Sequence, residues 1–232
     1  MKPVRTAPAL AEQVYGAVLE EICEGRLAPG THLVHEQLAE RLGVSRQPVQ
    51  QAMALPKADG MVEDVGRRGL RVVAIEPALM RRHYDIRAAL DGLAARSAAA
   101  RIRRDGPARD AFEASARAIL ATGGLAVEAD AIRDQIRADE ALHRLIHEAS
   151  GNPLLAPAAE PQWRFLRRVM GDVLRHAEPP RTIWRQHETI VEAILAGDPP
   201  EAEARAVEHA RVAVGMLAGS GGIGGKTTRR SA

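Results

Sequence analysis

The first segment of the chain carries apolar residues at every fourth position, which is the spacing of one helical face. These positions are Leu10, Val14, Val18 and Ile22. Gly25, Pro29 and Gly30 then interrupt the pattern, because both residue types disfavour a helix interior. The pattern therefore predicts a first helix of about four turns that starts at Leu10.

Two shorter helices are predicted next, separated by a glycine. The segment HEQLAERLG has its apolar residues on one face and ends at Gly43, where a left-handed residue would close the helix. Ser45 can cap the following helix, and Pro48 lies in its first turn, where the missing backbone donor costs little. The third helix is therefore expected to begin at about Arg46.

After Gly60 the spacing changes to that of β-strands. MVEDV and LRVVAI are two short β-prone runs around the glycine-bounded turn GRRG, which predicts a hairpin. Three helices followed by a hairpin form a winged helix-turn-helix, in which the second helix of the pair lies in the major groove of DNA. We therefore expect a DNA-binding domain over residues 9–75.

The start of the third helix carries side chains that suit DNA. An arginine can make a bidentate contact to guanine and a glutamine to adenine, while hydroxyls and exposed amides hold phosphates. Arginines in the wing turn can reach phosphates or the minor groove, and a solvated charged hairpin is the alternative. The candidate DNA-binding residues are Ser45, Arg46, Gln47, Gln50, Gln51, Arg67, Arg68 and Arg71.

From residue 77 to residue 218 the chain consists of long amphipathic segments that are rich in Ala and Arg. Breaks at residues 105–107, 123–124, 151–153, 178–180 and 197–200 divide them into about six helices. The fold class is therefore mainly α, a winged helix-turn-helix followed by an all-α helical bundle. Residues 219–232 are rich in Gly and Ser and are expected to be a disordered tail.

Composition narrows the class of protein. Of the 232 residues 46% are hydrophobic but only 3% aromatic, so the core must be built from Ala, Leu, Val and Ile. The net charge is +2, and residues 1–75 hold equal numbers of cations and acids, so affinity for non-specific DNA should be modest. Cys23, the single cysteine, excludes an internal disulfide, and no apolar run has the length of a signal peptide or membrane span. We expect a cytoplasmic protein without a membrane partner.

One carboxylate and three imidazoles in the predicted bundle have a spacing that suits one metal ion. Asp139 and His143 are four residues apart and share a helical face. His187 lies eleven residues before Asp198 and His209 eleven after it, so an antiparallel hairpin would place both at comparable depth. This donor set suits Zn²⁺ first, with Ni²⁺, Mn²⁺ or Fe²⁺ as alternatives. From spacing alone, solvated or helix-capping histidines remain the other interpretation.

Three segments of the first domain carry a resemblance to a known family. GRLAPGTHL, EQLAERLGVSRQPVQQAM and DGMVEDVGRRGLRV, in this order and spacing, closely resemble the DNA-binding domain of the GntR family of bacterial transcription regulators. The resemblance implies that Arg46 contacts DNA. The chain departs from the family pattern at Glu36, where an arginine is usual, and at Gln50 and Gln51, where Arg-Glu is usual.

A third departure is Pro56, which stands where the family has an uninterrupted helix. A proline there removes a backbone donor and clashes with the carbonyl of Ala52. We therefore expect the third helix to kink or end near Ala54 or Leu55, with Lys57 to Gly60 as an irregular or newly started turn.

The second domain, residues 77–218, resembles the FCD ligand-binding domain of FadR-type members of the same family. The resemblance implies a divalent metal held by Asp139, His143, His187 and His209. It also implies that Arg87 faces an effector cavity, where a guanidinium can grip a carboxylate; an ion pair with Asp91 is the alternative. His147 competes as a ligand, and we interpret it as an outer-sphere or surface residue.

These features together predict a homodimeric transcriptional regulator rather than an enzyme. Two winged helices would bind a near-palindromic operator, and a small carboxylate effector at the metal would change the placement of the DNA-binding domains. Repression relieved by the effector is the expected polarity. Two alternatives remain, a metal-dependent hydrolase and a purely structural metal. The hydrolase would leave the helix-turn-helix without a role.

Overall fold

The computed structural model of the protein describes residues 10–66, 69–174 and 181–219. The chain divides into two compact units, residues 1–75 and 76–232, which are described here one at a time. Arg67, Arg68, the break expected at 178–180 and residues 220–232 of the expected tail lie outside the described residues. No helix in the described part is long and apolar enough to cross a membrane.

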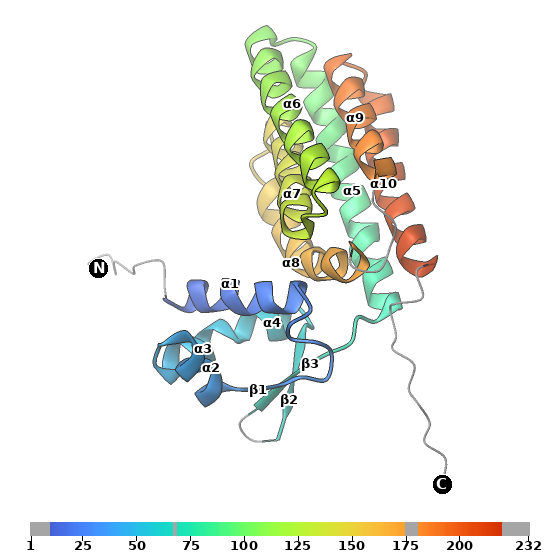
Figure 1. The fold of residues 1–232 in the computed structure, drawn as a ribbon. Coiled ribbons are helices and arrows are strands. Elements are labelled where there is room, and N and C mark those ends of the chain that lie inside the picture. The colour runs from blue at the N-terminus through green and yellow to red at the C-terminus, as the bar shows by residue number, and fades with distance from the viewer. Residues whose placement is uncertain (1–9, 67–68, 175–180, 220–232) are drawn as a thin grey trace, which may run out of the picture. The chain divides into compact units, whose positions relative to one another are not determined.

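The first unit is a winged helix-turn-helix (Figure 1). Its helices are α1 Leu10–Cys23, α2 His35–Leu42, α3 Arg46–Ala52 and α4 Ala54–Ala58. The strands β1 His32–Val34, β2 Val62–Val65 and β3 Gly69–Val72 form an antiparallel sheet in the order β1-β3-β2. The predicted hairpin is confirmed, whereas β1 was not foreseen, because three residues are too few to show a period of two.

The turn between α2 and α3 is closed as the sequence predicts. Gly43 ends α2 in the left-handed conformation, with φ +66°. Ser45 stands at the N-cap of α3 with extended backbone, but its side chain makes no capping hydrogen bond. The predicted position of the cap is confirmed and the predicted bond is wrong, which leaves the exposed Ser45 hydroxyl available to another partner.

Pro56 ends the third helix slightly earlier than expected. The break falls at Met53, whose ψ of −10° departs from the helical value, and α4 begins at Ala54. Pro56 is the third residue of α4, a position whose backbone N–H would have no partner within the helix. The predicted break is therefore confirmed within two residues, and of the two expected alternatives Lys57 lies in the newly started turn, α4, rather than in irregular chain.

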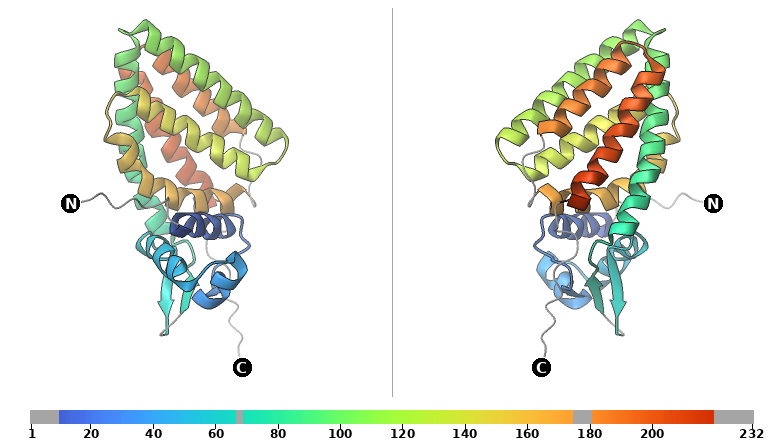
Figure 2. Two further views of the ribbon diagram at one scale, coloured as in Figure 1. Left: turned by 90° about the vertical axis from the view of Figure 1, so that its left-hand side faces the viewer. Right: turned by 90° about the vertical axis from the view of Figure 1, so that its right-hand side faces the viewer.

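The second unit is an all-α bundle of six helices in the described residues, the number that the sequence predicts (Figure 2). They are α5 Pro77–Ile102, α6 Gly106–Glu128, α7 Ile132–Ala149, α8 Leu155–Leu174, α9 Arg181–Leu195 and α10 Pro199–Gly219. α5 and α10 lie side by side along the bundle. Fully buried alanines at 94, 95, 98 and 99 of α5 face the core with Ala202 and Ala206 of α10, so small side chains let the helices approach closely.

The predicted break at residues 123–124 is wrong. α6 runs through both glycines to Glu128, and the chain turns at Asp130, which has φ +51°. The reason lies on another helix: a Cβ on Gly123 would stand 1.9 Å from the Trp184 Cη2 atom of α9. Gly123 therefore makes room for an indole ring instead of forming a turn.

Gly123→Ala should destabilise the protein although alanine is the better helix former. The added methyl overlaps Trp184, and overpacking of this kind costs about 1–3 kcal/mol. Gly124→Ala is the matched control, because a Cβ there meets nothing within 4 Å. It should stabilise the protein by about 0.5–1 kcal/mol. Thermal or urea unfolding of both variants measures the difference in stability. Equal changes in the free energy of unfolding would show that the Trp184 ring does not require the space that Gly123 leaves.

Candidate metal and effector site

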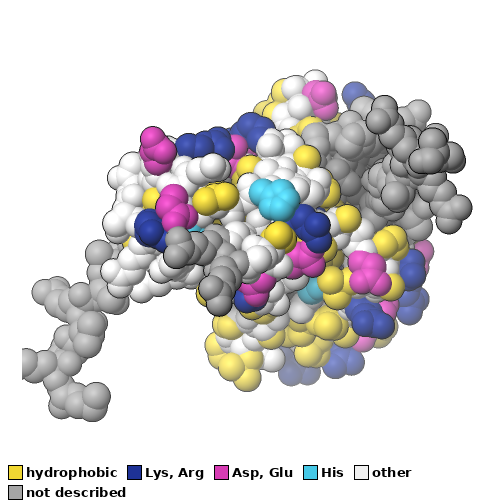
Figure 3. Space-filling view, turned by 90° about the horizontal axis from the view of Figure 1, so that it is seen from below, with side chains coloured by type: hydrophobic (Ala, Val, Ile, Leu, Met, Phe, Trp, Pro, Cys, Tyr) yellow, Lys and Arg dark blue, Asp and Glu magenta, His cyan; other side chains and the backbone are white. Residues whose placement is uncertain are grey.

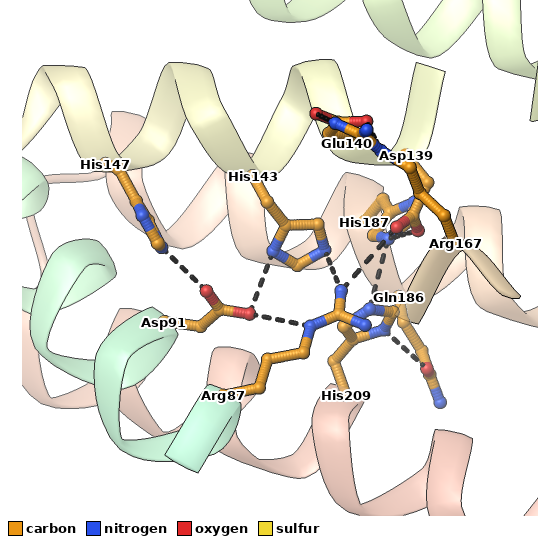
Figure 4. A network of polar contacts seen from close by, with 10 residues as sticks. All are labelled: Arg87, Asp91, Asp139, Glu140, His143, His147, Arg167, Gln186, His187 and His209. Atoms are coloured by element: carbon orange, nitrogen blue, oxygen red, sulfur yellow. Dashed lines mark hydrogen bonds and ion pairs between the residues drawn. The ribbon is translucent and has the colours of Figure 1, made fainter. Parts of the chain in front are cut away.

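Three helices of the second unit bring the four predicted ligands together. α7 contributes Asp139 and His143, α9 contributes His187 and α10 contributes His209 (Figure 4). One ligand atom from each residue lies within 4.8 Å of those of the other three, and each residue is 3% exposed or less. The sharp turn before α10, with Gly197 at φ +65°, makes α9 and α10 neighbours and aligns the two histidines.

Two distances inside this cluster match those between ligands of a single ion, while the four ligand atoms together lie within 4.8 Å of one another. The His187 Nε2 atom lies 3.1 Å from Asp139 Oδ1 and 3.2 Å from His209 Nε2. Two adjacent atoms that each bind one ion at about 2.0–2.1 Å, with tetrahedral or octahedral angles, are roughly 2.8–3.4 Å apart. The spacing of these three side chains is therefore the spacing that a divalent ion would require.

Among the described residues, two buried polar atoms of the cluster make no hydrogen bond, Asp139 Oδ2 and His187 Nδ1, although Arg87 Nη2 lies 3.6 Å from Asp139 Oδ2. A buried polar atom without a partner costs about 1–3 kcal/mol, so such atoms are rare unless a site has a further function. A carboxylate and three imidazoles are also the donors that borderline divalent metals prefer. By both tests the residues present fit a metal ion.

Arg87 of α5 lies beside the four ligands and is 3% exposed. Its Nε donates to Asp91 Oδ2 at 3.1 Å, and its Nη2 lies 2.7 Å from His143 Nε2 and 3.6 Å from Asp139 Oδ2. The indole of Trp163 covers it, with the Arg87 Cζ 4.6 Å from the ring centroid. The guanidinium thus points into the cluster and at the same time forms the ion pair with Asp91.

Asp91 links the cluster to His147, a role that the sequence did not reveal. Its carboxylate lies 3.0 Å from His143 Nδ1 and 2.7 Å from His147 Nε2. His147 is 1% exposed, so its interpretation as a surface residue is wrong and its outer-sphere role is the one that fits. A signal was available, because 87 and 91, like 143 and 147, are one helical turn apart.

Hydrogen bonds at the outer nitrogens decide which ring nitrogens can bind an ion. When His143 donates from Nδ1 to Asp91, its Nε2 keeps a lone pair on the cluster side, where Arg87 Nη2 lies 2.7 Å away. His209 is held in the same way, since its Nδ1 lies 3.1 Å from Gln186 Oε1. Outer partners of this kind fix the tautomer and the orientation of metal-binding histidines.

Burial and neighbouring charges set the ionisation of these groups. Burial opposes ionisation of Asp139, but the hydrogen bond from His187 and nearby positive charges hold its pKa below the usual value. Burial lowers the pKa of His143, and Arg87 lowers it further. Burial and the neighbouring His187 hold the pKa of His209 well below its usual value. A charged carboxylate and neutral imidazoles are the states that bind a cation.

A groove on the surface of the second unit runs next to this cluster. It has a volume of about 280 Å³ and lies between α5 and α10, lined by Tyr84 and Ala88 from one helix and Val207 and Ala210 from the other. The ring of Tyr84 lies 5.7 Å from the Arg87 Cζ. Tyr84 therefore lines the groove and also neighbours the guanidinium.

Those predicted DNA-contacting residues that the structure describes lie on the surface of the first unit. Ser45, Arg46, Gln47, Gln50 and Gln51 are all exposed in and before α3. Arg71 is exposed on β3, but its Nε donates to Glu63 Oε1 of β2 at 2.9 Å. On the face seen in Figure 3, Lys and Arg side chains of the described residues lie among Asp and Glu side chains.

Comparison with known proteins covers both units. The model of the bacterial regulatory proteins of the gntR family matches residues 10–72, and that of the FCD domain matches residues 82–212. The HTH-type transcriptional repressor RspR of Escherichia coli is 27% identical over 198 residues, 85% of this chain and 84% of its own. A probable D-xylose utilization operon transcriptional repressor of Paenarthrobacter nicotinovorans is 30% identical over 221 residues, 94% of this chain and 92% of its own.

Solved structures show the same fold. McbR/YncC of E. coli has a TM-score of 0.76 at 19% identity, over 90% of this chain and 97% of its own. A transcriptional regulator GntR from Rhodococcus has a TM-score of 0.71 at 17% identity, over 90% and 98%. Both structures therefore share the fold of this chain.

Proposed function

This chain belongs to the GntR family of bacterial regulatory proteins and carries an FCD domain, and we therefore propose that it is a repressor controlled by a small organic acid at a metal site. It is a DNA-binding transcriptional regulator, as its relatives are, and not an enzyme. The proposal concerns what controls it. The observation that carries it is the convergence of four buried ligand atoms within 4.8 Å, beside the buried Arg87.

Each residue of the cluster has a distinct role in this proposal. Asp139, His143, His187 and His209 hold one divalent ion, with Zn²⁺ the first candidate. A bound ion would supply positive charge for a carboxylate oxygen of the effector. Arg87 Nη2 lies 2.7 Å from His143 Nε2, so if that nitrogen served as a ligand, the Nη2 hydrogens would be free for the effector. Arg87 then grips the carboxylate through two parallel hydrogen bonds.

The activity that the effector would control is binding of the operator DNA. Arg46 and the glutamines of α3 contact base edges, and a homodimer places two such helices on a near-palindromic operator. Two relatives bear the name repressor, which supports repression as the polarity. Coupling between two sites is reciprocal, so an effector that weakens operator binding must itself bind more weakly to the operator-bound protein.

A purely structural ion is the second candidate. It is favoured by the low exposure of the four ligands and by the absence of Arg87 from the residues that line the described groove. In that case the ion would stiffen the bundle without binding an effector.

A thermal-shift screen separates the two candidates. Metal-loaded full-length protein is mixed with small mono- and dicarboxylic acids. An acid that binds, present at a concentration of 100 times its Kd, should stabilise the protein by about 2.7 kcal/mol. Arg87→Met should abolish this response while metal binding persists. Arg96→Met, which removes an exposed arginine of the same helix, is the control and should leave the response intact. Stabilisation by metal but by none of the acids would leave only the structural ion.

A further inference from the structure

The two helices of the helix-turn-helix are joined by an ion pair at the DNA-contacting end of α3. Arg46 is the first residue of α3, and its Nη2 lies 2.7 Å from Oε1 of Glu36 in the first turn of α2. Both side chains are about half exposed, at 54% and 41%. The guanidinium that is best suited to bind guanine is therefore already held by a carboxylate in the free protein.

Other cations of this unit are balanced in the same manner. Arg71 pairs with Glu63 across the wing strands, and Lys57 of α4 pairs with Asp64 of β2. Acids in such positions repel the phosphate backbone, which supplies most of the affinity for non-specific DNA. Glu36 differs from Glu63 and Asp64 because its partner is the predicted base-reading arginine.

We propose that Glu36 is a positioning residue that sets the base specificity of Arg46. An arginine side chain loses much conformational freedom when it is fixed on a base, and the ion pair removes part of that cost in advance. The contact to Glu36 engages one of five N–H donors, which leaves enough of them for a bidentate bond to guanine O6 and N7. At sites without that guanine, the carboxylate faces the DNA with no compensating bond.

Glu36 thus acts in opposite directions on the two kinds of site. On the operator it keeps Arg46 ordered, and on other sequences its charge weakens binding. The inference rests on the proposed reading role of Arg46, and the experiment has to separate failure of that role from failure of the ion pair.

The experiment uses full-length protein and duplexes selected from a random-sequence library by the wild type. Binding is then measured to the selected duplex, to its single-base-pair variants and to an unrelated duplex, at several salt concentrations. The proteins are wild type, Glu36→Gln, Arg46→Ala and the double variant. Glu40→Gln is the matched control, since it removes the same charge from an exposed position one turn further along α2.

Glu36→Gln should reduce discrimination at the base pair read by Arg46 by about 2- to 5-fold, the scale of an exposed ion pair. It should also tighten binding to the unrelated duplex, and only this second effect should appear with Glu40→Gln. In the Arg46→Ala background, Glu36→Gln should no longer change discrimination at any base pair.

Three outcomes would overturn the inference. If Glu36→Gln and Glu40→Gln behave alike, Glu36 is only a solvated charge. If the effect of Glu36→Gln on discrimination persists without Arg46, Glu36 contacts DNA by itself. If Arg46→Ala has the same specificity profile as wild type, the reading role of Arg46 fails, and the positioning role of Glu36 fails with it.

Discussion

His187→Ala is expected to lower the affinity of the full-length protein for Zn²⁺ by more than the roughly 10- to 100-fold that loss of an outer hydrogen-bond partner costs. The His187 Nε2 atom is central to the cluster, since it lies 3.1 Å from Asp139 Oδ1 and 3.2 Å from His209 Nε2. Its removal takes away one of four ligands and leaves the Asp139 carboxylate with one partner fewer. Isothermal calorimetry on protein first stripped of metal measures the change.

His83→Ala is the matched control for that measurement. His83 lies on α5, where its Nδ1 is 2.6 Å from Gln162 Oε1 and its ring stacks on Phe165 at 3.9 Å between centroids. It shares the second unit and the residue type of His187 but belongs to a different set of contacts. Equal losses of affinity in the two variants would mean that Zn²⁺ binds histidines without regard to the cluster.

Arg46→Ala is expected to lower affinity for the specific operator by about 1–3 kcal/mol, with loss of discrimination at one base pair in each half-site. The reason is that an alanine cannot replace the bidentate contact to guanine. Arg68→Ala, a change in the wing turn, should instead weaken binding nearly uniformly and flatten the salt dependence. Titrations of operator variants with each protein measure both effects, and identical specificity profiles for wild type and Arg46→Ala would remove Arg46 from base reading.

Local patterns in the sequence were sufficient to predict most of the helices and strands. Apolar periodicity predicts α1, α2 and the β2–β3 hairpin, and glycine or proline signals mark the starts of α3 and α10. The candidate metal cluster was only partly accessible from such patterns, because spacing alone left solvated or capping histidines open and the resemblance to the FCD domain selected the four residues. Spacing by four residues on α7, and equal distances from the turn at Asp198, are one-dimensional signals of side chains that meet.

The features that could not be predicted from the sequence are contacts between residues far apart along the chain. Gly123 was interpreted as a break because its packing reason, Trp184, lies on another helix. The carboxylate of Asp91 meets His143 and His147 only once α5 and α7 pack together. The one-turn spacings 87–91 and 143–147 show which side chains share a helical face, but they do not show that these two faces meet.

The metal content of the full-length protein tests the central claim most directly. The protein is purified without chelators, reconstituted at neutral pH with Zn²⁺, Ni²⁺, Mn²⁺ or Fe²⁺, dialysed and analysed by elemental mass spectrometry. The cluster of Asp139, His143, His187 and His209 predicts one transition-metal ion per chain, and none in a variant that lacks His187 and His209. Less than about a tenth of an equivalent in the native protein, with no gain on reconstitution, would contradict the metal site and the effector control built on it.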